Sequence, residues 1–210
     1  MKTFKHLFYA VCLLTLTAVN AQVTTTTVIK GSPYLDDTFA DGAIHYASKV
    51  HTAPVRYNIF LDVVEYQQAG KPLALDPNET IKKVRIGEMT LIPMKYEDNG
   101  KSKFAYFQLL DSGKVTLYSK KKIIILQPKK GGALDGSDQP AEYKRSGDTF
   151  YFKTSDGVLQ EIESIKSMIA TLPDKQEELT VFAKKEKISP RKEKEVIQFV
   201  KYYNSLAEEE

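Results

Sequence analysis

The sequence is poor in the residues that most often carry covalent or metal chemistry. Among 210 residues there are one cysteine, three histidines and no tryptophan. The cysteine, Cys12, lies in an apolar stretch near the N-terminus. Neither a Gly-x-Ser-x-Gly elbow nor a Gly-x-x-x-x-Gly-Lys phosphate loop occurs. Outside the N-terminal stretch that contains Cys12, the chain therefore offers no residues for a cysteine nucleophile, and nowhere does it offer a serine-hydrolase elbow or a nucleotide-binding P-loop.

Neither charge sign is in large excess, and long apolar runs are also scarce. Lysine and arginine number 30 against 27 acids, a formal net charge of +3. Because proteins that neutralise phosphates concentrate cations, nucleic acid is not an expected partner. After the first 21 residues the longest apolar run, Ile123–Leu126, has the length of a strand, so no transmembrane span is expected. The hydrophobic content of 42% is nevertheless that of a folded chain.

The N-terminus has the layout of a secretory signal peptide. Two lysines precede the ten-residue apolar run 7–16, which leads to small residues ending at Ala21. This pattern predicts that residues 1–21 are removed before Gln22. A membrane anchor is the alternative, but the run is shorter than the roughly 20 apolar residues that a spanning helix needs.

Cleavage at this point changes the chemistry of the mature chain. It removes two lysines, which lowers the net charge by two, and it removes Cys12. A thiol-free exported protein that relies on its core is more typical of bacterial envelopes than of disulfide-rich animal domains. We therefore expect the protein in the periplasm, at the outer membrane or in the medium.

Residues 22–160 have the pattern of short antiparallel strands. β-Branched and aromatic runs are separated by turn residues, and Asn99-Gly100 is the strongest hairpin turn because both residues tolerate positive φ. The main runs are 55–61, 63–66, 81–86, 89–92, 104–110, 115–118, 123–126 and 149–153. They predict an antiparallel β-meander or an open barrel-like sheet.

Residues 161–207 change to a helical period of apolar residues, which predicts two to three amphipathic helices. Pro173 is expected to end the first helix, and Asp174 with Glu177 to form a capping box for the second. Ser189 is expected to cap the third. The third helix presents one apolar stripe, formed by Val196, Phe199, Val200 and Tyr203. The predicted class is α+β, with the helices packed on the sheet in one domain; a separate helical hairpin is the alternative.

The segment 34–42 mixes aromatic and acidic residues and is interpreted as an ordered loop. Its candidate contact surface consists of Tyr34, Asp36, Asp37, Phe39 and Asp41. The three aspartates also form a possible calcium loop, as do Asp135 and Asp138. Neither spacing matches an EF-hand, and Asp, Gly and Ser are ordinary turn formers, so no metal ion or cofactor is expected.

Catalytic chemistry finds little support. His45 alternates with apolar residues and is expected in a strand, while His51 is expected at the surface or in a turn. Neither has a neighbour that would complete a serine triad or a zinc site. With 27 acids a carboxylate-based hydrolase remains open, but no spacing selects a pair. No catalytic residue is therefore assigned.

The most basic stretch is Lys120–Lys122. It could contact an anionic lipid or polysaccharide surface. We interpret it instead as a solvated strand end, where the charges protect the aggregation-prone Ile123–Ile125.

Short motifs spread over most of the chain carry a resemblance to a known group. They are Asn20–Gln22, Gly31–Asp37, Val55–Asn58, Leu172–Lys175 and Val200–Asn204. Through them the chain resembles uncharacterised exported proteins of Bacteroidetes-type bacteria. The resemblance implies an envelope location, and it brings no activity and no site residues.

Together these observations favour an exported non-enzymatic envelope protein, a binding or assembly module with an envelope protein as its partner. The alternatives are a carboxylate-based hydrolase and a small-ligand or lipid carrier. An enzyme requires a deep pocket with converging acids, and a carrier requires an apolar cavity inside the sheet.

Overall fold

Alternating apolar residues and tight turns build most of the chain into antiparallel strands. The computed structural model describes residues 29–131, 136–155 and 157–208, so the predicted signal peptide lies outside the described residues. The strands are β1 (Ala40–Tyr46), β2 (Val50–Asn58), β3 (Val63–Gln68), β4 (Lys71–Leu75), β5 (Ile81–Ile86), β6 (Met89–Asp98), β7 (Lys101–Asp111), β8 (Val115–Lys120), β9 (Ile123–Leu126), β10 (Glu142–Arg145), β11 (Thr149–Thr154) and β12 (Gln160–Glu161). The helices are α1 (Ile165–Thr171), α2 (Gln176–Lys185) and α3 (Glu193–Glu208).

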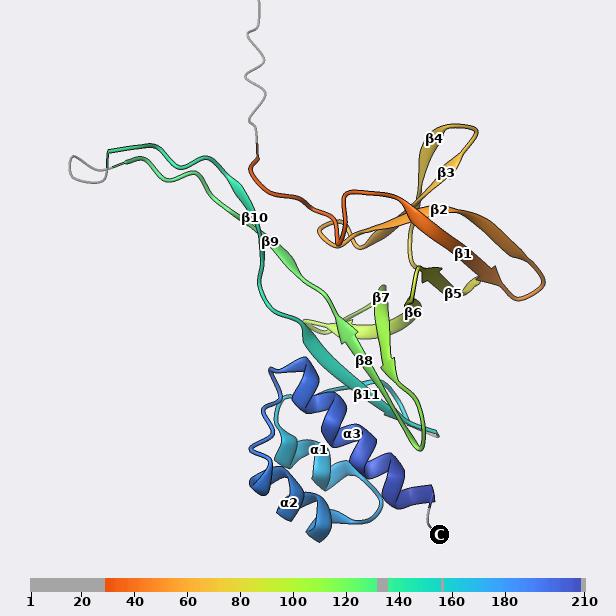
Figure 1. The fold of residues 1–210 in the computed structure, drawn as a ribbon, viewed down its shortest axis with the longest axis vertical. Coiled ribbons are helices and arrows are strands. Elements are labelled where there is room, and N and C mark those ends of the chain that lie inside the picture. Colours follow the sequence, from red (N-terminus) through yellow and green to blue (C-terminus); the bar gives the residue numbers. More distant parts are fainter. Residues whose placement is uncertain (1–28, 132–135, 156, 209–210) are drawn as a thin grey trace, which may run out of the picture.

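Ten of these strands form one curled, half-barrel sheet in the order β12-β11-β8-β7-β6-β5-β1-β2-β3-β4. Figure 1 shows the three helices gathered at one end of it, beside β8 and β11. The predicted α+β class and the position of the helices after the sheet are thus confirmed. The sheet is not a simple meander, because β5 returns beside β1 rather than beside β4.

Two hairpin turns and one close contact between strands help to set how the strands of the sheet align. Asn99 and Gly100 have φ of 51° and 73°, so the predicted hairpin turn joins β6 to β7. A second turn of this kind, Ala69-Gly70, joins β3 to β4. Gly42 lies where β1 is flanked by both β2 and β5. A Cβ there would lie 2.5 Å from the carbonyl oxygen of Arg85, so the residue must be glycine for the three strands to pack.

A two-stranded arm extends from the half-barrel sheet. β8 and β11 are paired in the sheet. The arm consists of β9, which follows β8, and β10, which precedes β11, and these two strands form a separate two-stranded sheet. Figure 1 shows this arm projecting away from the body of the molecule. Lys30 extends the arm by one parallel bridge to Glu142. The candidate calcium residue Asp135 lies outside the described residues.

The helices cover one face of β8 and β11. The predicted stripe of α3 is confirmed, because all four of its residues are 0% exposed in a cluster with Val115, Leu117, Phe150 and Phe152. Two predicted helix starts are wrong. The N-cap of α2 is Lys175 at φ 62°, without a side-chain cap, and α3 begins at Glu193 after a turn at Pro190. At α3 the Ser189 hydroxyl accepts from the backbone N–H of Arg191 at 3.3 Å, within the turn that precedes the helix.

Asp174 is used for a tertiary contact instead of a helix cap. Its carboxylate accepts hydrogen bonds from Lys114 Nζ at 2.6 Å and from the Tyr203 hydroxyl at 2.9 Å. It therefore connects the β7–β8 turn to α3 just ahead of α2. The hydrogen bond from Lys114, and then that from Tyr203, holds the pKa of the Asp174 carboxyl below its usual 3.8.

This pKa shift predicts a specific acid sensitivity. A carboxylate with a lowered folded-state pKa stabilises the fold above its unfolded pKa, and the stabilisation is lost as pH falls through the folded value. We therefore expect the difference in unfolding free energy between wild type and Asp174→Asn to shrink as pH falls below about 3.8. Urea titrations between pH 7 and pH 3 measure this. A pH-independent difference would show that the charge of Asp174 is not stabilising.

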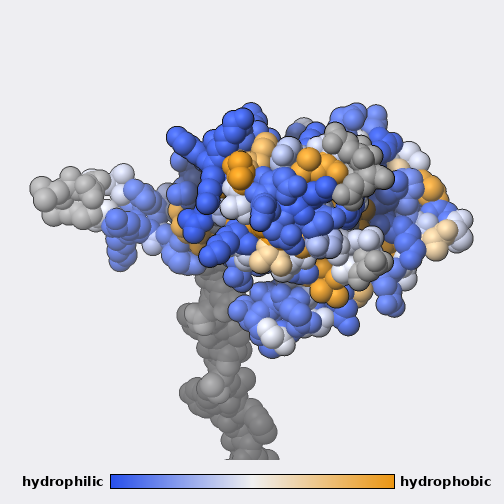
Figure 2. All heavy atoms as spheres, turned by 90° about the horizontal axis from the view of Figure 1, so that it is seen from below, coloured by the Kyte–Doolittle hydropathy of each residue, from blue (hydrophilic) through white to orange (hydrophobic). Residues whose placement is uncertain are grey.

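The surface at the helical end is mainly polar. Figure 2 views this end and shows hydrophilic residues over most of it, with apolar residues in small separate areas. Within the described ranges, no helix is both long and apolar enough to cross a bilayer.

Candidate functional site

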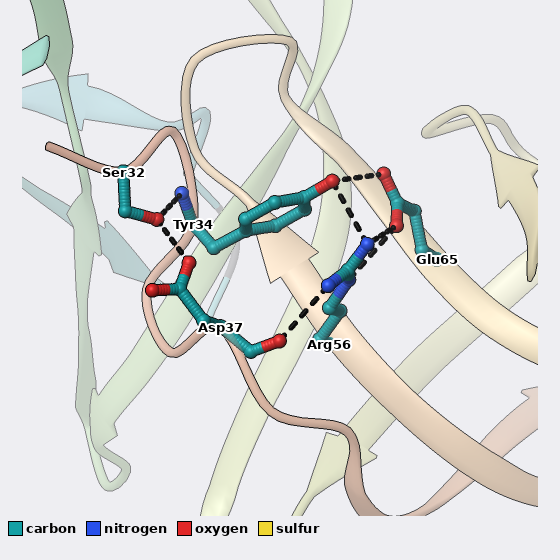
Figure 3. A network of polar contacts seen from close by, with 5 residues as sticks. All are labelled: Ser32, Tyr34, Asp37, Arg56 and Glu65. Atoms are coloured by element: carbon teal, nitrogen blue, oxygen red, sulfur yellow. Dashed lines mark hydrogen bonds and ion pairs between the residues drawn. The ribbon is translucent and has the colours of Figure 1, made fainter. Parts of the chain in front are cut away.

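Arg56 of β2 holds the N-terminal segment that contains the predicted contact residues. Its guanidinium carbon lies 3.8 Å from the ring centroid of Tyr34 and 4.4 Å from that of Phe39. Its Nε and Nη2 donate to Glu65 of β3 at 2.9 and 2.7 Å, and the Tyr34 hydroxyl donates to the same carboxylate at 3.0 Å (Figure 3). Nη1 donates to the backbone carbonyl of Asp37 at 2.9 Å. The network therefore fastens the segment to β2 and β3.

The three predicted aspartates of this segment are exposed and serve different local roles. Asp36 Oδ1 accepts from the hydroxyl and the backbone N–H of Thr38, and these two bonds lower the pKa of the Asp36 carboxyl. The Asp37 carboxylate accepts from the Ser32 hydroxyl, and Asp41 lies at the exposed start of β1. Binding of a partner to this surface stays a prediction.

Replacing Arg56 with lysine tests how the segment is held. Lysine keeps the charge but loses the planar, forked donors that match a carboxylate and stack on rings. We expect Arg56→Lys to reduce the free energy of unfolding by about 1.5 kcal/mol. We also expect faster amide hydrogen exchange over residues 34–39. Lys49→Arg, at an exposed site, is the control and should change neither; unchanged exchange in Arg56→Lys would mean that the stacked network does not hold the segment.

A cleft of about 840 Å³ opens where the arm separates from the half-barrel. β7 and β8 are paired at Gln108 and Ser119, but the chain then diverges into β9 while β7 continues beside β6. We name this space the β7–β9 cleft. It is lined by Ile59, Phe60, Leu61, Asp62, Asp76, Pro77, Tyr96, Asp98, Lys103, Phe104, Lys120, Lys121, Lys122, Ile123, Thr149, Tyr151 and Glu161.

Asp62, in the β2–β3 turn, lines the cleft and connects three of its surrounding segments. Its Oδ1 accepts from the Tyr57 hydroxyl at 2.6 Å and from the backbone N–H of Tyr106 at 3.3 Å. Its Oδ2 accepts from Lys120 Nζ at 2.9 Å. Burial is the main cause that raises the pKa of the Tyr57 phenol far above its usual value, so this hydroxyl stays protonated and donates. Asp62 has φ of 55°, a left-handed conformation that Asp tolerates better than most residues.

The lysine run is not the solvated strand end that we expected. Lys120 and Lys121 have only 19% and 11% of their side chains exposed. Lys121 pairs with Asp148 at 2.8 Å and lies 3.8 Å from Glu193 of α3, so it links the arm to the helices. Lys122 is exposed and, within the described part of the chain, has no ion pair. The run therefore supplies two structural cations and one exposed cation at the cleft.

The two histidines among the described residues, His45 and His51, lie in strands and do not line the β7–β9 cleft. His45 is in β1, as its alternation with apolar residues predicts. His51, expected at the surface or in a turn, lies in β2 rather than in a turn; it is partly exposed, and its ring is edge-on to Tyr66 at 5.4 Å. Among the described residues, no three His, Cys, Asp or Glu side chains cluster closely enough to hold a metal ion.

The sequence pointed to the lysine run but not to the cleft that it lines. Asp62 is separated from Lys120 by 58 positions and from Tyr106 by 44, so their meeting leaves no local pattern. The one local signal was a turn between two strand-like runs, which many aspartates share. Comparison with family models, curated proteins and solved structures found no match to this chain.

Proposed function

We propose that this chain is an exported, non-enzymatic envelope protein that binds its ligand in the β7–β9 cleft. The cleft itself carries the proposal. Its volume of about 840 Å³ is within the range of ligand sites, and several of its charged groups, among them Asp62 with Lys120 and Asp98 with Lys103, are already oriented by ion pairs. Groups held in this way bind without a large cost of ordering side chains.

Three of the four acids of the cleft are held by hydrogen-bond or ion-pair partners, which favours binding over hydrolysis. Asp62 is shared by three donors, Asp98 is paired with Lys103 and Glu161 accepts from the Tyr151 hydroxyl at 3.3 Å. A general acid in glycoside hydrolysis needs a raised pKa. Where the pKa of a described carboxyl departs from its usual value, it is lowered, as in Asp36, Asp98, Asp174 and Glu195.

The lining also argues for a polar ligand rather than a lipid. Eight of the seventeen lining residues are charged, four acidic and four basic. An acyl chain in this space would bury those charges without new partners, which is unfavourable. Apolar side chains at the rim, Phe60 and Leu61, supply contact area without making the cleft apolar throughout.

Site-specific photo-crosslinking in native envelopes tests the proposal. Leu61, 62% exposed at the rim of the cleft, is replaced by benzoylphenylalanine; Val181, 66% exposed on α2, is the matched control. We expect a discrete adduct from position 61 and none from position 181. We also expect the envelope-bound chain to begin at Gln22. Equal labelling at the two positions, or recovery of the uncleaved chain from the cytoplasm, would overturn the proposal.

A further inference from the structure

The edge of β9 that faces the β7–β9 cleft lacks a partner strand. The backbone N–H of Ser146 donates to the carbonyl of Lys122 at 3.1 Å, which places that carbonyl on the side of β10. Because successive residues of a strand direct their backbone groups to opposite edges, Ile123 and Ile125 direct theirs away from β10. In the described chain, no backbone–backbone hydrogen bond reaches β9 on that side.

β7 has a matching open edge across the cleft. The backbone N–H of Tyr106 donates to the side chain of Asp62 and not to a strand. By the same alternation, Ser102 and Phe104 direct their backbone groups to this edge, and among the described residues no other strand pairs with it there. Phe104 and Ile123 both line the cleft. The cleft is thus bounded by two unpaired edges, one on β7 and one on β9.

The outer edges of the ten-stranded sheet are protected, which sets the β9 edge apart. β12 contains only two residues. In β4, the two-residue turn at Ala69-Gly70 makes Lys71 face β3, so Pro72 faces outward, where it offers no N–H. Natural sheets commonly protect open edges by such means. The free edge of β9 has no proline and consists of strongly β-forming residues.

The side chains beside this edge indicate what kind of strand would fit. Phe60, Leu61 and Leu126 are 38%, 62% and 38% exposed, so apolar side chains are available on the arm and at the rim. Lys122 is the cation nearest to β9 in sequence, and it has no ion pair within the described residues. Its charge is among those that lower the pKa of the Asp98 carboxyl, yet Lys122 is exposed, so an acidic side chain on an incoming strand can still pair with it.

We propose that an extended segment of a partner protein, with alternating apolar and acidic side chains, binds in the β7–β9 cleft as an added strand along β9. This inference rests on the proposed function, because it names the ligand of the same cleft. Main-chain hydrogen bonds to Ile123 and Ile125 supply affinity, and Lys122 with the exposed apolar side chains supplies specificity. This is the mode of recognition that an open strand edge allows without rearrangement of the sheet.

Selection from a phage-displayed library of random 12-residue peptides on the full-length protein tests this inference. We expect enriched peptides to alternate apolar with acidic residues. The best one, made synthetically and labelled with fluorescein, should bind at least about 10-fold more weakly when alternate amides are N-methylated, because it then loses main-chain donors. Absence of enrichment, or equal binding of the N-methylated peptide, would overturn strand addition.

Two variants locate the binding edge. Ile125→Pro removes an outward N–H of β9 and no β9–β10 hydrogen bond, and we expect it to weaken peptide binding at least about 10-fold. Ala74→Pro makes the same change on the outer edge of β4 and should bind like wild type. If Ile125→Pro does not fold, Lys122→Glu serves instead and should weaken the acidic peptide about 10-fold. Wild-type affinity in a folded Ile125→Pro or in Lys122→Glu would overturn the assignment.

A second copy of this chain is the rival occupant of the edge. Analytical ultracentrifugation distinguishes it, because a wild-type dimer that becomes monomeric in Ile125→Pro would assign β9 to self-association. We expect wild type to be monomeric at the concentrations used for peptide binding. The Leu61 crosslink reports on the cleft independently. An adduct there together with failed peptide binding would preserve the proposed function and overturn only the added strand.

Discussion

Replacing Asp62 with alanine should lower the free energy of unfolding by about 4 kcal/mol, the largest effect that we expect from one side chain. The substitution leaves the Tyr57 hydroxyl and the backbone N–H of Tyr106 without their acceptor. Both residues are almost completely buried, at 2% and 1% exposed. It also leaves Lys120, with 19% of its side chain exposed, without its counter-charge. Urea unfolding followed by far-UV circular dichroism measures the change.

Two further variants separate the roles of Asp62. Asp62→Asn keeps one carbonyl acceptor for Tyr57 and Tyr106 but removes the charge beside Lys120. We therefore expect its free energy of unfolding to lie between that of wild type and that of Asp62→Ala. Asp98→Ala removes a more exposed carboxylate of the same cleft, 40% exposed and paired with Lys103, and should cost less than about 0.5 kcal/mol. Similar losses for Asp62→Ala and Asp98→Ala would contradict the stabilising role of the Asp62 contacts with Tyr57, Tyr106 and Lys120.

Replacing Asn204 with alanine should cost about 3 kcal/mol, because Asn204 hydrogen-bonds both backbone groups of Val115. Its Oδ1 accepts from the N–H of Val115 at 2.9 Å, and its Nδ2 donates to the carbonyl of Val115 at 2.9 Å. Val115 is 0% exposed, so water cannot easily replace these bonds. The expected result is a lower urea midpoint with loss of hydrogen-exchange protection at the start of β8.

The neighbouring Ser205 provides the control. Its hydroxyl donates to the carbonyl of Tyr202 on the exposed side of α3, so Ser205→Ala should change stability by no more than about 0.5 kcal/mol. Asn204→Asp keeps the acceptor for the Val115 N–H and loses the donor for the Val115 carbonyl; we expect an intermediate loss. If Asn204→Ala unfolds like Ser205→Ala, α3 is held by apolar packing alone.

The two ends of the molecule have separate apolar clusters and are connected in part by polar contacts. The helices cover the β8–β11 face through one apolar cluster, and β1–β5 enclose a second cluster around Ile44, Val55 and Val64. Polar contacts of Lys121 connect the root of the arm to the helical end, because Lys121 pairs with Asp148 and approaches Glu193 of α3. We expect the β7–β9 cleft to respond to changes at these links, because they position the root of the arm.

Local signals were sufficient for a large part of the fold. The Asn99-Gly100 turn, the strands around it and the apolar stripe of α3 each depend on residues close together in the chain, and each was predicted. The starts of α2 and α3 were predicted wrongly. Asp174 has the residue type of a helix cap, but Lys114 and Tyr203 bind its carboxylate, and neither contact is visible in the local sequence.

The candidate site depended almost entirely on long-range contacts. The sequence drew attention to Tyr34 and the aspartates after it, and the structure places that segment against Arg56 and Glu65. It also drew attention to the lysine run, yet it could not show that Asp62 meets Lys120. Neither the pairing of β1 between β2 and β5 nor the separation of β9 from β7 follows from strand patterns, because alternation identifies a strand without naming its neighbour.

The amino-acid sequence was therefore sufficient to predict the strand-rich region, the helices that follow it and the hairpin turn. It also showed that Cys12 is the only residue available for cysteine chemistry. These properties arise from residue type and from spacing over a few positions. The pairing of the strands, the burial of Lys120 and Lys121 and the position of the cleft became visible only in the folded chain. Those outcomes depend on residues tens of positions apart, whose contacts form only when the sheet curls and brings the β2–β3 turn to the root of the arm.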